Sequence, residues 1–245
     1  HPSMANDNLS GAIVSMCLIN YFSKLKNLEK TIRFIFIPET IGSITYLSKN
    51  LSYLKANVFG GFNLSCIGDE KQHSCIFSKY ENSPSDRAII ESYNKLKIKF
   101  KRYSFLERGS DERQYNSPGI DLPITSIFRT KYGKYPEYHT SLDDFNLVTE
   151  KGIKAGLSVV KEAINILNEK IIPKNNILCE PQMSKRSLRS SLSTKDFKKS
   201  TLNYMNFLQY ADGKNDLNNI SRKIKVNAQL TKKIYTLLKN NNLID

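Results

Sequence analysis

The sequence contains no apolar run long enough to cross a membrane. Its most apolar stretch, IRFIFIP at 32–38, is far shorter than the roughly 18 residues that a transmembrane helix needs. Apolar residues make up 40% of the 245 residues and charged residues 24%, a composition typical of globular proteins. The sequence therefore predicts a globular chain with no membrane partner, long enough for one full domain and a smaller second one.

Cysteine is scarce, and no motif pairs the cysteines. The four of them, Cys17, Cys66, Cys75 and Cys179, include no CxxC pair and lie in apolar segments. This pattern is typical of reduced, buried thiols and not of a disulfide framework, and it argues against zinc held by cysteines. No basic segment followed by an apolar stretch opens the sequence, so a secretory route has no support and we expect a cytoplasmic protein.

Positive charge dominates, but unevenly. The net charge is +14, and residues 183–245 hold 13 lysines and arginines against 4 acidic residues, which places +9 in that segment and +5 in residues 1–182. A basic segment suits nucleic acid or another polyanion. A solvated, lysine-rich surface is the more general explanation, and composition leaves both open.

The apolar periodicity alternates between helical and extended segments. Helices are predicted at 11–26, at 41–49, from a Ser83 cap to 96, and at 148–171; strands are predicted at 31–38, 60–69, 74–79 and 122–128. This alternation predicts an α/β fold with a mixed, mostly parallel sheet flanked by helices. Ligands of such sheets collect beyond the carboxyl ends of the strands, where Glu39 and Asp69 are expected.

The remaining residues predict a second, smaller module. Residues 1–172 are expected to form the first domain, and 173–194, rich in proline and serine, a linker that packs on it. Residues 195–245 contain three short amphipathic segments, one of them capped by Asp216. Three short helices in so few residues predict an all-α, winged-helix-like domain.

Histidine is the scarcest metal-binding residue, and two of the three histidines lie beside carboxylates, in HPSMAND and YHTSLDD. Imidazole and carboxylate groups are the ligands of hydrolytic zinc sites, so His1, Asp7, Asp69 and His139 are the candidate metal ligands. Glu39 is the candidate general base that takes a proton from water. Because many α/β proteins place acidic residues after strands, spacing alone leaves a purely structural role open.

The order of four motifs adds a family resemblance. HPSMANDNLSG, FIFIPETIGS, LSCIGD and EYHTSLDD resemble, in sequence, the zinc aminopeptidase superfamily, which includes glutaminyl cyclases, over residues 1 to about 170. PETIGS, SDERQY and PEYHTSLDD are similar to the aminopeptidase-like proteins of bacterial polysaccharide biosynthesis clusters, which end in a winged helix.

The resemblance implies a zinc site with defined roles. Asp7 would bridge two metals, His1 and Asp69 would complete one site, and His139 would belong to the other, with Glu39 as the base. Thr40 stands where these peptidases carry a second acidic residue, and threonine is a poor zinc ligand. The resemblance therefore implies one or two zinc ions, with the site on the His139 side short of a ligand.

Further candidates come from the loops. Arg113, Gln114 and Tyr115 of SDERQY are candidates for substrate contacts, with a salt-bridged loop as the alternative. Asp143 and Asp144 either orient an imidazole or begin the following helix. His73, between DEKQ and SCIF, is expected to be an ordinary surface or turn histidine.

Two functions from different classes follow. The first is a metal-dependent hydrolase of the aminopeptidase type, acting on a peptide or amide bond, which includes an amide on an amino sugar, and linked to surface polysaccharide biosynthesis. The second is a non-catalytic binding or regulatory protein whose winged-helix-like domain contacts nucleic acid or another subunit. The expected recognition helix of that domain offers Lys232, Lys233 and Lys239 but no arginine, the commoner base reader. We also expect the native protein to extend upstream of His1. The sequence does not decide whether the protein forms an oligomer.

Overall fold

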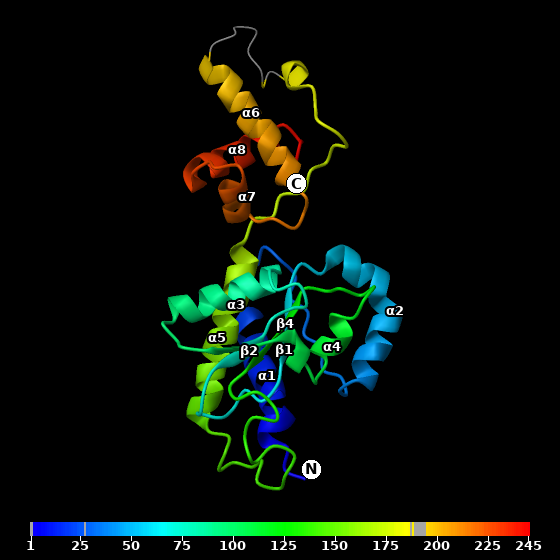
Figure 1. Cartoon of the computed structure of the whole chain (residues 1–245), viewed down its shortest axis with the longest axis vertical. Coiled ribbons are helices and arrows are strands. Elements are labelled where there is room, and N and C mark those ends of the chain that lie inside the picture. The colour runs from blue at the N-terminus through cyan, green and yellow to red at the C-terminus, as the bar shows by residue number, and fades with distance from the viewer. Residues whose placement is uncertain (1, 27, 187, 189–194) are drawn as a thin grey trace. The chain divides into compact units, whose positions relative to one another are not determined.

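The computed structural model describes residues 2–26, 28–186, 188 and 195–245, and the chain divides into two compact units, His1–Glu169 and Lys170–Asp245. The first unit contains helices α1 (Ser10–Phe22), α2 (Ile41–Asn57), α3 (Pro84–Lys95), α4 (Glu112–Tyr115) and α5 (Glu150–Glu169), and strands β1 (Gly61–Leu64), β2 (Ser74–Ile76), β3 (Lys101–Tyr103) and β4 (Ile124–Phe128). Short turns of helix lie at Ala5–Leu9 and Phe105–Glu107 (Figure 1).

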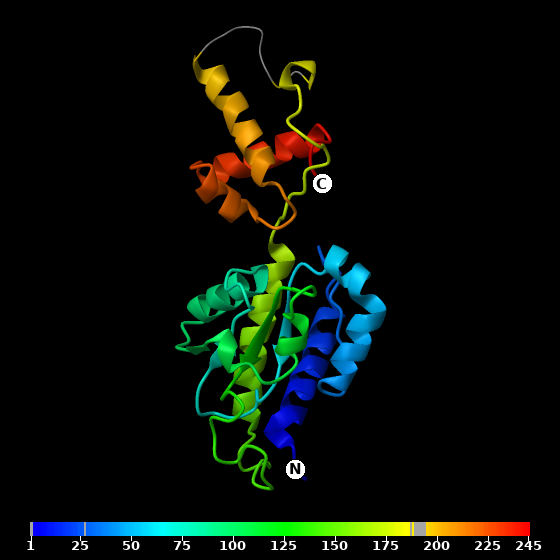
Figure 2. The ribbon, with the colours of Figure 1, turned by 45° about the vertical axis from the view of Figure 1, so that its right-hand side comes forward.

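The four strands form one mixed sheet in the order β1-β4-β2-β3. β1 pairs with β4 and β2 pairs with β3 in parallel, whereas β2 and β4 are antiparallel. Helices cover both faces, as Figures 1 and 2 show. The expected α/β class, with a mixed, mostly parallel sheet flanked by helices, is confirmed.

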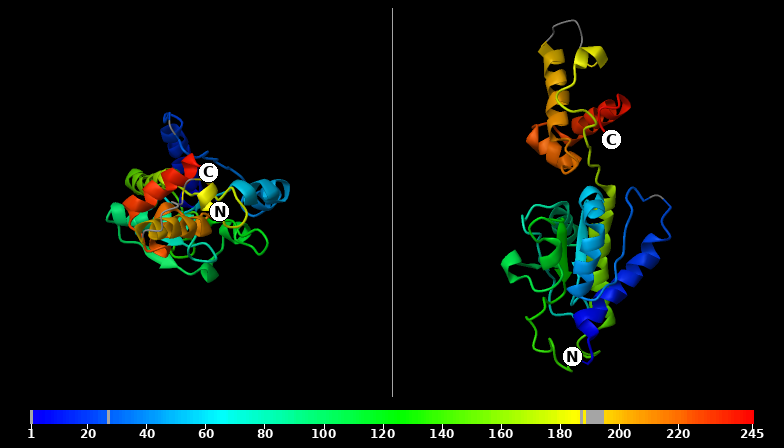
Figure 3. Two further views of the ribbon diagram at one scale, coloured as in Figure 1. Left: turned by 90° about the horizontal axis from the view of Figure 1, so that it is seen from above. Right: turned by 90° about the vertical axis from the view of Figure 1, so that its right-hand side faces the viewer.

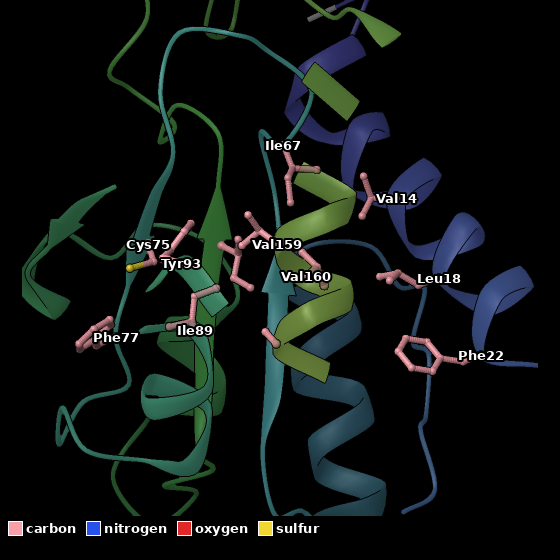
Figure 4. Packing of buried hydrophobic residues seen from close by; sticks show 12 residues of the cluster. Val14, Leu18, Phe22, Ile67, Cys75, Phe77, Ile89, Tyr93, Val159 and Val160 are labelled. Carbon is pink, nitrogen blue, oxygen red and sulfur yellow. The ribbon is translucent and has the colours of Figure 1, made fainter. Parts of the chain in front are cut away.

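Alternation along β4 divides the core between the two faces of the sheet. Ile127 faces a cluster built by α1, α3 and α5, in which Val14, Leu18, Ile89 and Val159 are fully or almost fully buried (Figure 4). On the other face, neighbouring residues of β4 meet α2, α4 and the loop after β4. The apolar stripes of the predicted helices therefore pack where an α/β fold requires them.

The Ser83 cap shows how local sequence positions an element. The Ser83 hydroxyl accepts a hydrogen bond from the Asp86 backbone N–H at 3.2 Å, and the Asp86 carboxylate accepts from the Ser83 N–H at 2.8 Å. The same buried carboxylate accepts from both the N–H and the hydroxyl of Ser78 and from the hydroxyl of Thr125. This capping box therefore begins α3 and also ties it to the sheet.

The strand predicted at 31–38 is wrong. The segment is extended, and Ile32 and Phe34 pack partly against the α1 cluster, but none of the described strands pairs with it. Ile35 and Phe36 are 40% and 52% exposed. The β-branched and aromatic run ended by proline favoured a buried strand, but a strand also needs a hydrogen-bonding neighbour, which the described part of the chain does not supply.

The second unit is built from α6 (Lys195–Tyr210), α7 (Leu217–Lys223) and α8 (Ala228–Asn240), with a short helical turn at Met183–Arg186. Figure 3 shows the three helices from two further directions. Asp216 and Asn227 cap α7 and α8 by accepting from the N–H groups of Asn219 and Leu230, both at 2.8 Å. The described helices agree with the predicted three-helix module.

The described residues of the predicted linker, 173–194, contact the second unit. Lys174 and Asn175 form isolated β-bridges with Asp212 and Ile244, and Met183 is buried in the core of the second unit. Met183 and Leu188 of this proline- and serine-rich stretch thus complete the small core of the second unit, and the packing of 173–194 on the first domain stays a prediction. Within the described ranges, no helix is both long and apolar enough to span a membrane.

Candidate active site

A loop held from two sides positions Asp7, between the first residues of the chain and α1. The Asp143 carboxylate accepts hydrogen bonds from the backbone N–H groups of Asn6 at 2.6 Å and Asp7 at 2.9 Å. On the other side, the Asn6 side chain accepts from the Gly68 N–H at 2.8 Å and donates to Asp69 at 3.2 Å. Asp7 therefore lies against the segment that leaves β1, and Asp143 positions its backbone instead of orienting an imidazole.

His139 meets Asp7 at this place. Its Nε2 is 3.3 Å from Oδ2 of Asp7, although the two residues are far apart in sequence. The imidazole stacks on the ring of Tyr138, with centroids 3.9 Å apart and planes inclined by 18°. The His139 side chain is 60% exposed and that of Asp7 is 15% exposed, so the pair lies at a surface that a substrate can reach.

Cys66 and Tyr135 lie on the buried side of Asp7. Burial raises the pKa of Asp7, while His139 lowers it and Asp143 raises it further. Burial and the nearby Asp7 carboxylate raise the pKa of the Cys66 thiol, and the Tyr135 hydroxyl donates to its sulfur at 3.4 Å. The thiol is thus a neutral neighbour of Asp7. The sequence predicted a reduced, buried cysteine at this position but not that it lies beside Asp7.

Glu39 approaches the same place from the start of α2. Partial burial raises the pKa of Glu39, a hydrogen bond with Ser110 lowers it, and the carboxylates of Asp111 and Asp7 raise it. The positive charge of Arg113 lowers the pKa of Glu39. The carboxyl group of Glu39 therefore lies within electrostatic reach of Asp7, and its role as a base stays a prediction.

The PETIGS and SDERQY motifs meet around Glu39. The Asp111 carboxylate accepts from the Thr40 N–H and from the Ser43 hydroxyl, each at 2.8 Å, and so caps α2. The Arg113 guanidinium donates to the Thr40 hydroxyl at 2.7 Å. Arg113 is therefore placed beside Glu39, and Thr40 serves as its acceptor.

A buried carboxylate anchors SDERQY to the sheet. Glu112 is fully buried and accepts five hydrogen bonds, from the backbone N–H groups of Gly109 and Ser110 and from the side chains of Tyr132, Ser126 and Asn63. The shortest, from the Tyr132 hydroxyl, is 2.6 Å. This anchor holds α4, and with it Ser110 and Asp111, in position next to Glu39.

Three other candidates lie elsewhere or act differently. Asp69 is fully buried, and its two oxygens accept from the Lys71 N–H, the Asn6 amide, and the N–H and hydroxyl of Thr130. A carboxylate has about four lone-pair sites, so protein donors use all of them and Asp69 is not placed as the predicted ligand. Tyr115 packs with the apolar cluster beneath α2, and Gln114 makes no side-chain hydrogen bond in the described part of the chain.

The donor set fits zinc only in part. Asp7 and His139 offer the carboxylate and imidazole that a hydrolytic site uses, and the buried Oδ1 of Asn8 has no hydrogen-bond partner. Among the described residues, however, no three histidine, cysteine or acidic side chains form a group that could hold a metal ion. His1 lies outside the described residues, so its predicted role stays a prediction.

Comparison with known proteins gives consistent relatives for both units. Residues 1–170 match the model of a domain of unknown function, DUF4910, and residues 171–245 match a winged helix-turn-helix model. A Clostridium acetobutylicum protein named for polysaccharide biosynthesis and an aminopeptidase-like domain is 36% identical over 225 residues, which are 91% of this chain and 51% of that protein. A crystal structure from the same organism, described as a peptidase, is 32% identical with a TM-score of 0.68, covering 100% of this chain and 55% of that one.

More distant solved structures share the fold. A zinc aminopeptidase from Bacillus subtilis is 18% identical with a TM-score of 0.59 over 69% of this chain and 43% of its own. An aminopeptidase from Legionella pneumophila is 15% identical with the same TM-score over 69% and 47%. At these identities the likeness shows the fold alone.

These relatives confirm the resemblance to aminopeptidase-like proteins that carry a C-terminal winged helix. The chain spans about half the length of the Clostridium proteins that it matches. Because the first family model covers residues 1–170, more than half of the sequence, the chain belongs to the DUF4910 family.

Proposed function

We propose that the first unit is the catalytic part of a metal-dependent hydrolase of the aminopeptidase type. One observation carries the proposal: two loops far apart in sequence bring Asp7 and His139 to 3.3 Å, with the Glu39 carboxyl group within electrostatic reach of Asp7. The fold shared with zinc aminopeptidases supports it. Asp69, with its oxygens fully used, has no part in the proposed site.

Asp7 and His139 would hold a zinc ion, with His1 as a further ligand, and zinc would polarise the scissile carbonyl and lower the pKa of water. Glu39 accepts the proton from the attacking water and passes it to the departing amine. Its raised pKa suits this exchange, because a base is most useful when its pKa lies closer to the working pH. Ser110 and Asp111 hold Glu39 and the start of α2 in place.

The substrate proposed is a peptide or another amide, including an amide on an amino sugar. Arg113, bound to Thr40 and close to Glu39, is placed to contact an anionic group of that substrate. A role in polysaccharide biosynthesis is proposed from the name of the Clostridium relative. The cytoplasmic location stays a prediction.

A non-catalytic binding protein is the second candidate. It is favoured by Thr40, which supplies a hydroxyl where a second carboxylate ligand is expected, and by the absence of a three-residue metal cluster in the ranges that the structure describes. In this case the peptidase fold recognises a ligand without cleaving it, and the exposed Lys232, Lys233 and Lys239 of α8 offer charge for a polyanion.

Zinc titration and turnover, measured on the same protein, separate the two candidates. We expect the chain to bind zinc and to release amine from an amide panel that includes aminoacyl anilides and N-acyl amino sugars. Glu39→Gln should abolish release and leave zinc affinity unchanged, because glutamine keeps the shape but cannot take the proton. Glu162→Gln, a surface partner of Lys95, is the matched control and should behave as the wild type.

Three outcomes contradict the proposal. Loss of zinc by Glu39→Gln would make Glu39 a ligand instead of the base. Full turnover by that variant would remove it from the mechanism. Zinc bound without release from any amide of the panel would favour the binding protein.

A further inference from the structure

A cavity of about 440 Å³ in the first unit shares no lining residue with the Asp7 loop. It is lined by residues 70–73 before β2, by residues 99–101 at the start of β3, and by Arg129, which directly follows β4; we call it the basic pocket. The pairing of β2 with β3 and with β4 brings these three segments together. Its lining holds four lysine or arginine side chains and one acidic one.

Arg129 is the central cation of the basic pocket. The residue is only 6% exposed, its Nε donates to the backbone oxygen of Asp69 at 2.7 Å, and its Nη1 lies against Nε2 of His73. None of the described residues accepts from Nη2. Nη2 is not one of the buried atoms that lack a partner, so this end of the guanidinium fork is open to solvent and can donate to a ligand in the pocket.

His73 fixes the direction of that fork. It was expected to be an ordinary surface or turn residue, but it is half-buried and lines the pocket. Burial, together with the nearby Arg129 charge, lowers the pKa of His73 to about 4. The imidazole is therefore neutral near pH 7, and Nε2 can accept from the guanidinium without adding repulsion.

Glu70, the acidic residue that lines the pocket, is paired with a lysine, whereas two of the lysines that line it have no carboxylate partner among the described residues. Glu70 accepts from Thr149 at 2.7 Å and pairs with Lys151 at 2.5 Å, both outside the pocket. Lys71 is likewise paired, with Glu137 at 2.7 Å. By contrast, Lys99 and Lys101 have no carboxylate partner among the residues that the structure describes. Their charges, with that of Arg129, are available to a ligand.

We propose that the basic pocket binds a phosphoryl group, as free phosphate or as the phosphate of an ester. A tetrahedral oxyanion with two negative charges matches one guanidinium group and the ammonium groups of two exposed lysines, which together provide several donors. Planar carboxylates would use the fork but not both lysines. This site is independent of the hydrolase proposed above.

The test is a titration of the whole chain at constant ionic strength, with binding followed by isothermal calorimetry. The probes are inorganic phosphate, methyl phosphate and sodium acetate. Saturable binding of phosphate or methyl phosphate, and none of acetate, is expected. Tighter binding of methyl phosphate identifies an ester as the source, and tighter binding of inorganic phosphate identifies the free anion.

Variants locate the site. Lys99→Gln combined with Lys101→Gln should weaken phosphate binding about tenfold or more, since two of three free charges are removed. Lys24→Gln, an exposed lysine outside the pocket, is the matched control and should leave binding unchanged. Arg129→Lys keeps the charge but loses the fork, and should weaken binding while the circular dichroism spectrum stays that of the wild type.

The proposal is overturned if neither phosphate probe saturates up to 10 mM (about −2.7 kcal/mol of binding), or if acetate binds as tightly. Unchanged phosphate binding in the double lysine variant overturns it as well, because those side chains are exposed and their loss should not unfold the chain. If Arg129→Lys alone fails to fold, the lysine variant still decides.

Discussion

Replacing Asp143 by asparagine tests how the Asp7 loop is held. Each oxygen of Asp143 accepts one backbone N–H, from Asn6 at 2.6 Å and from Asp7 at 2.9 Å, and the residue is fully buried. Asparagine keeps one acceptor but turns an NH₂ group toward the other N–H. One charge-assisted bond, worth about 1.5–3 kcal/mol, is lost and two donors face each other. We expect a loss of about 2–4 kcal/mol in the free energy of unfolding of the first unit.

Asp144→Asn is the matched control, because among the described residues the neighbouring carboxylate accepts only from Asn146, within its own turn. At roughly 2–4 °C per kcal/mol for a domain of this size, Asp143→Asn should lower the melting temperature by about 5–15 °C, and Asp144→Asn should barely change it. Hydrogen exchange read on peptides of residues 1–169 assigns the change to the first unit. Equal losses in the two variants would refute the reasoning that Asp143 pins the loop.

Three further predictions concern the scaffold. Glu112→Gln should destabilise the first unit by about 2–4 kcal/mol in urea unfolding, because glutamine must present donors to groups that already donate to Glu112. The control Glu107→Gln, at an exposed residue, should change the free energy of unfolding little. A Glu112→Gln protein as stable as the wild type would contradict this. Gly152→Ala should destabilise more strongly than a surface substitution, because the added Cβ would lie 1.9 Å from the backbone oxygen of Gly68; a melting temperature equal to the wild type would be the contrary result. His73 has a pKa of about 4 in the folded chain against 6.5 unfolded, so the unfolded chain binds more protons between these values and stability should fall as the pH drops from about 6.5 to about 4. His73→Gln should flatten this dependence in pH-resolved thermal unfolding, and an unchanged slope would show that His73 does not cause it.

Much of the fold follows from local sequence. The Ser83–Asp86 capping box, Pro84 and the apolar stripe of α3 all indicate the same helix, and the structure confirms it. β3 was missed because Lys101–Tyr103 is three residues long and mostly charged, so no apolar pattern marks it. The segment 31–38 has the composition of a strand, and its sequence carries no information on whether a pairing edge is present.

The candidate site could be predicted only in outline. Asp7, Glu39 and His139 lie in motifs whose loops the fold brings together, while their roles stay predictions. Asp69 follows a strand in the way a ligand would, but sequence cannot show that Thr130, 61 positions later, uses its oxygens.

The contacts of Ser110 and Asp111 with the start of α2 depend on long-range packing in the same way, as does the place of Cys66 beside Asp7. No local motif identifies Asp111 as the residue that caps α2, because the two segments are distant in sequence. The local signal was the polar SDERQY run itself, in which Arg113, Gln114 and Tyr115 were the candidates for contacts, whereas Ser110 and Asp111 make those with Glu39 and the start of α2.

The most direct test of the account is a crystal structure of the chain grown with zinc, with diffraction data collected on both sides of the zinc absorption edge. We expect one anomalous peak about 2 Å from a carboxylate oxygen of Asp7 and from Nε2 of His139, with Asp69 still bound to Thr130 and Asn6. A peak ligated by Asp69, or the absence of any peak at Asp7 and His139, would contradict it.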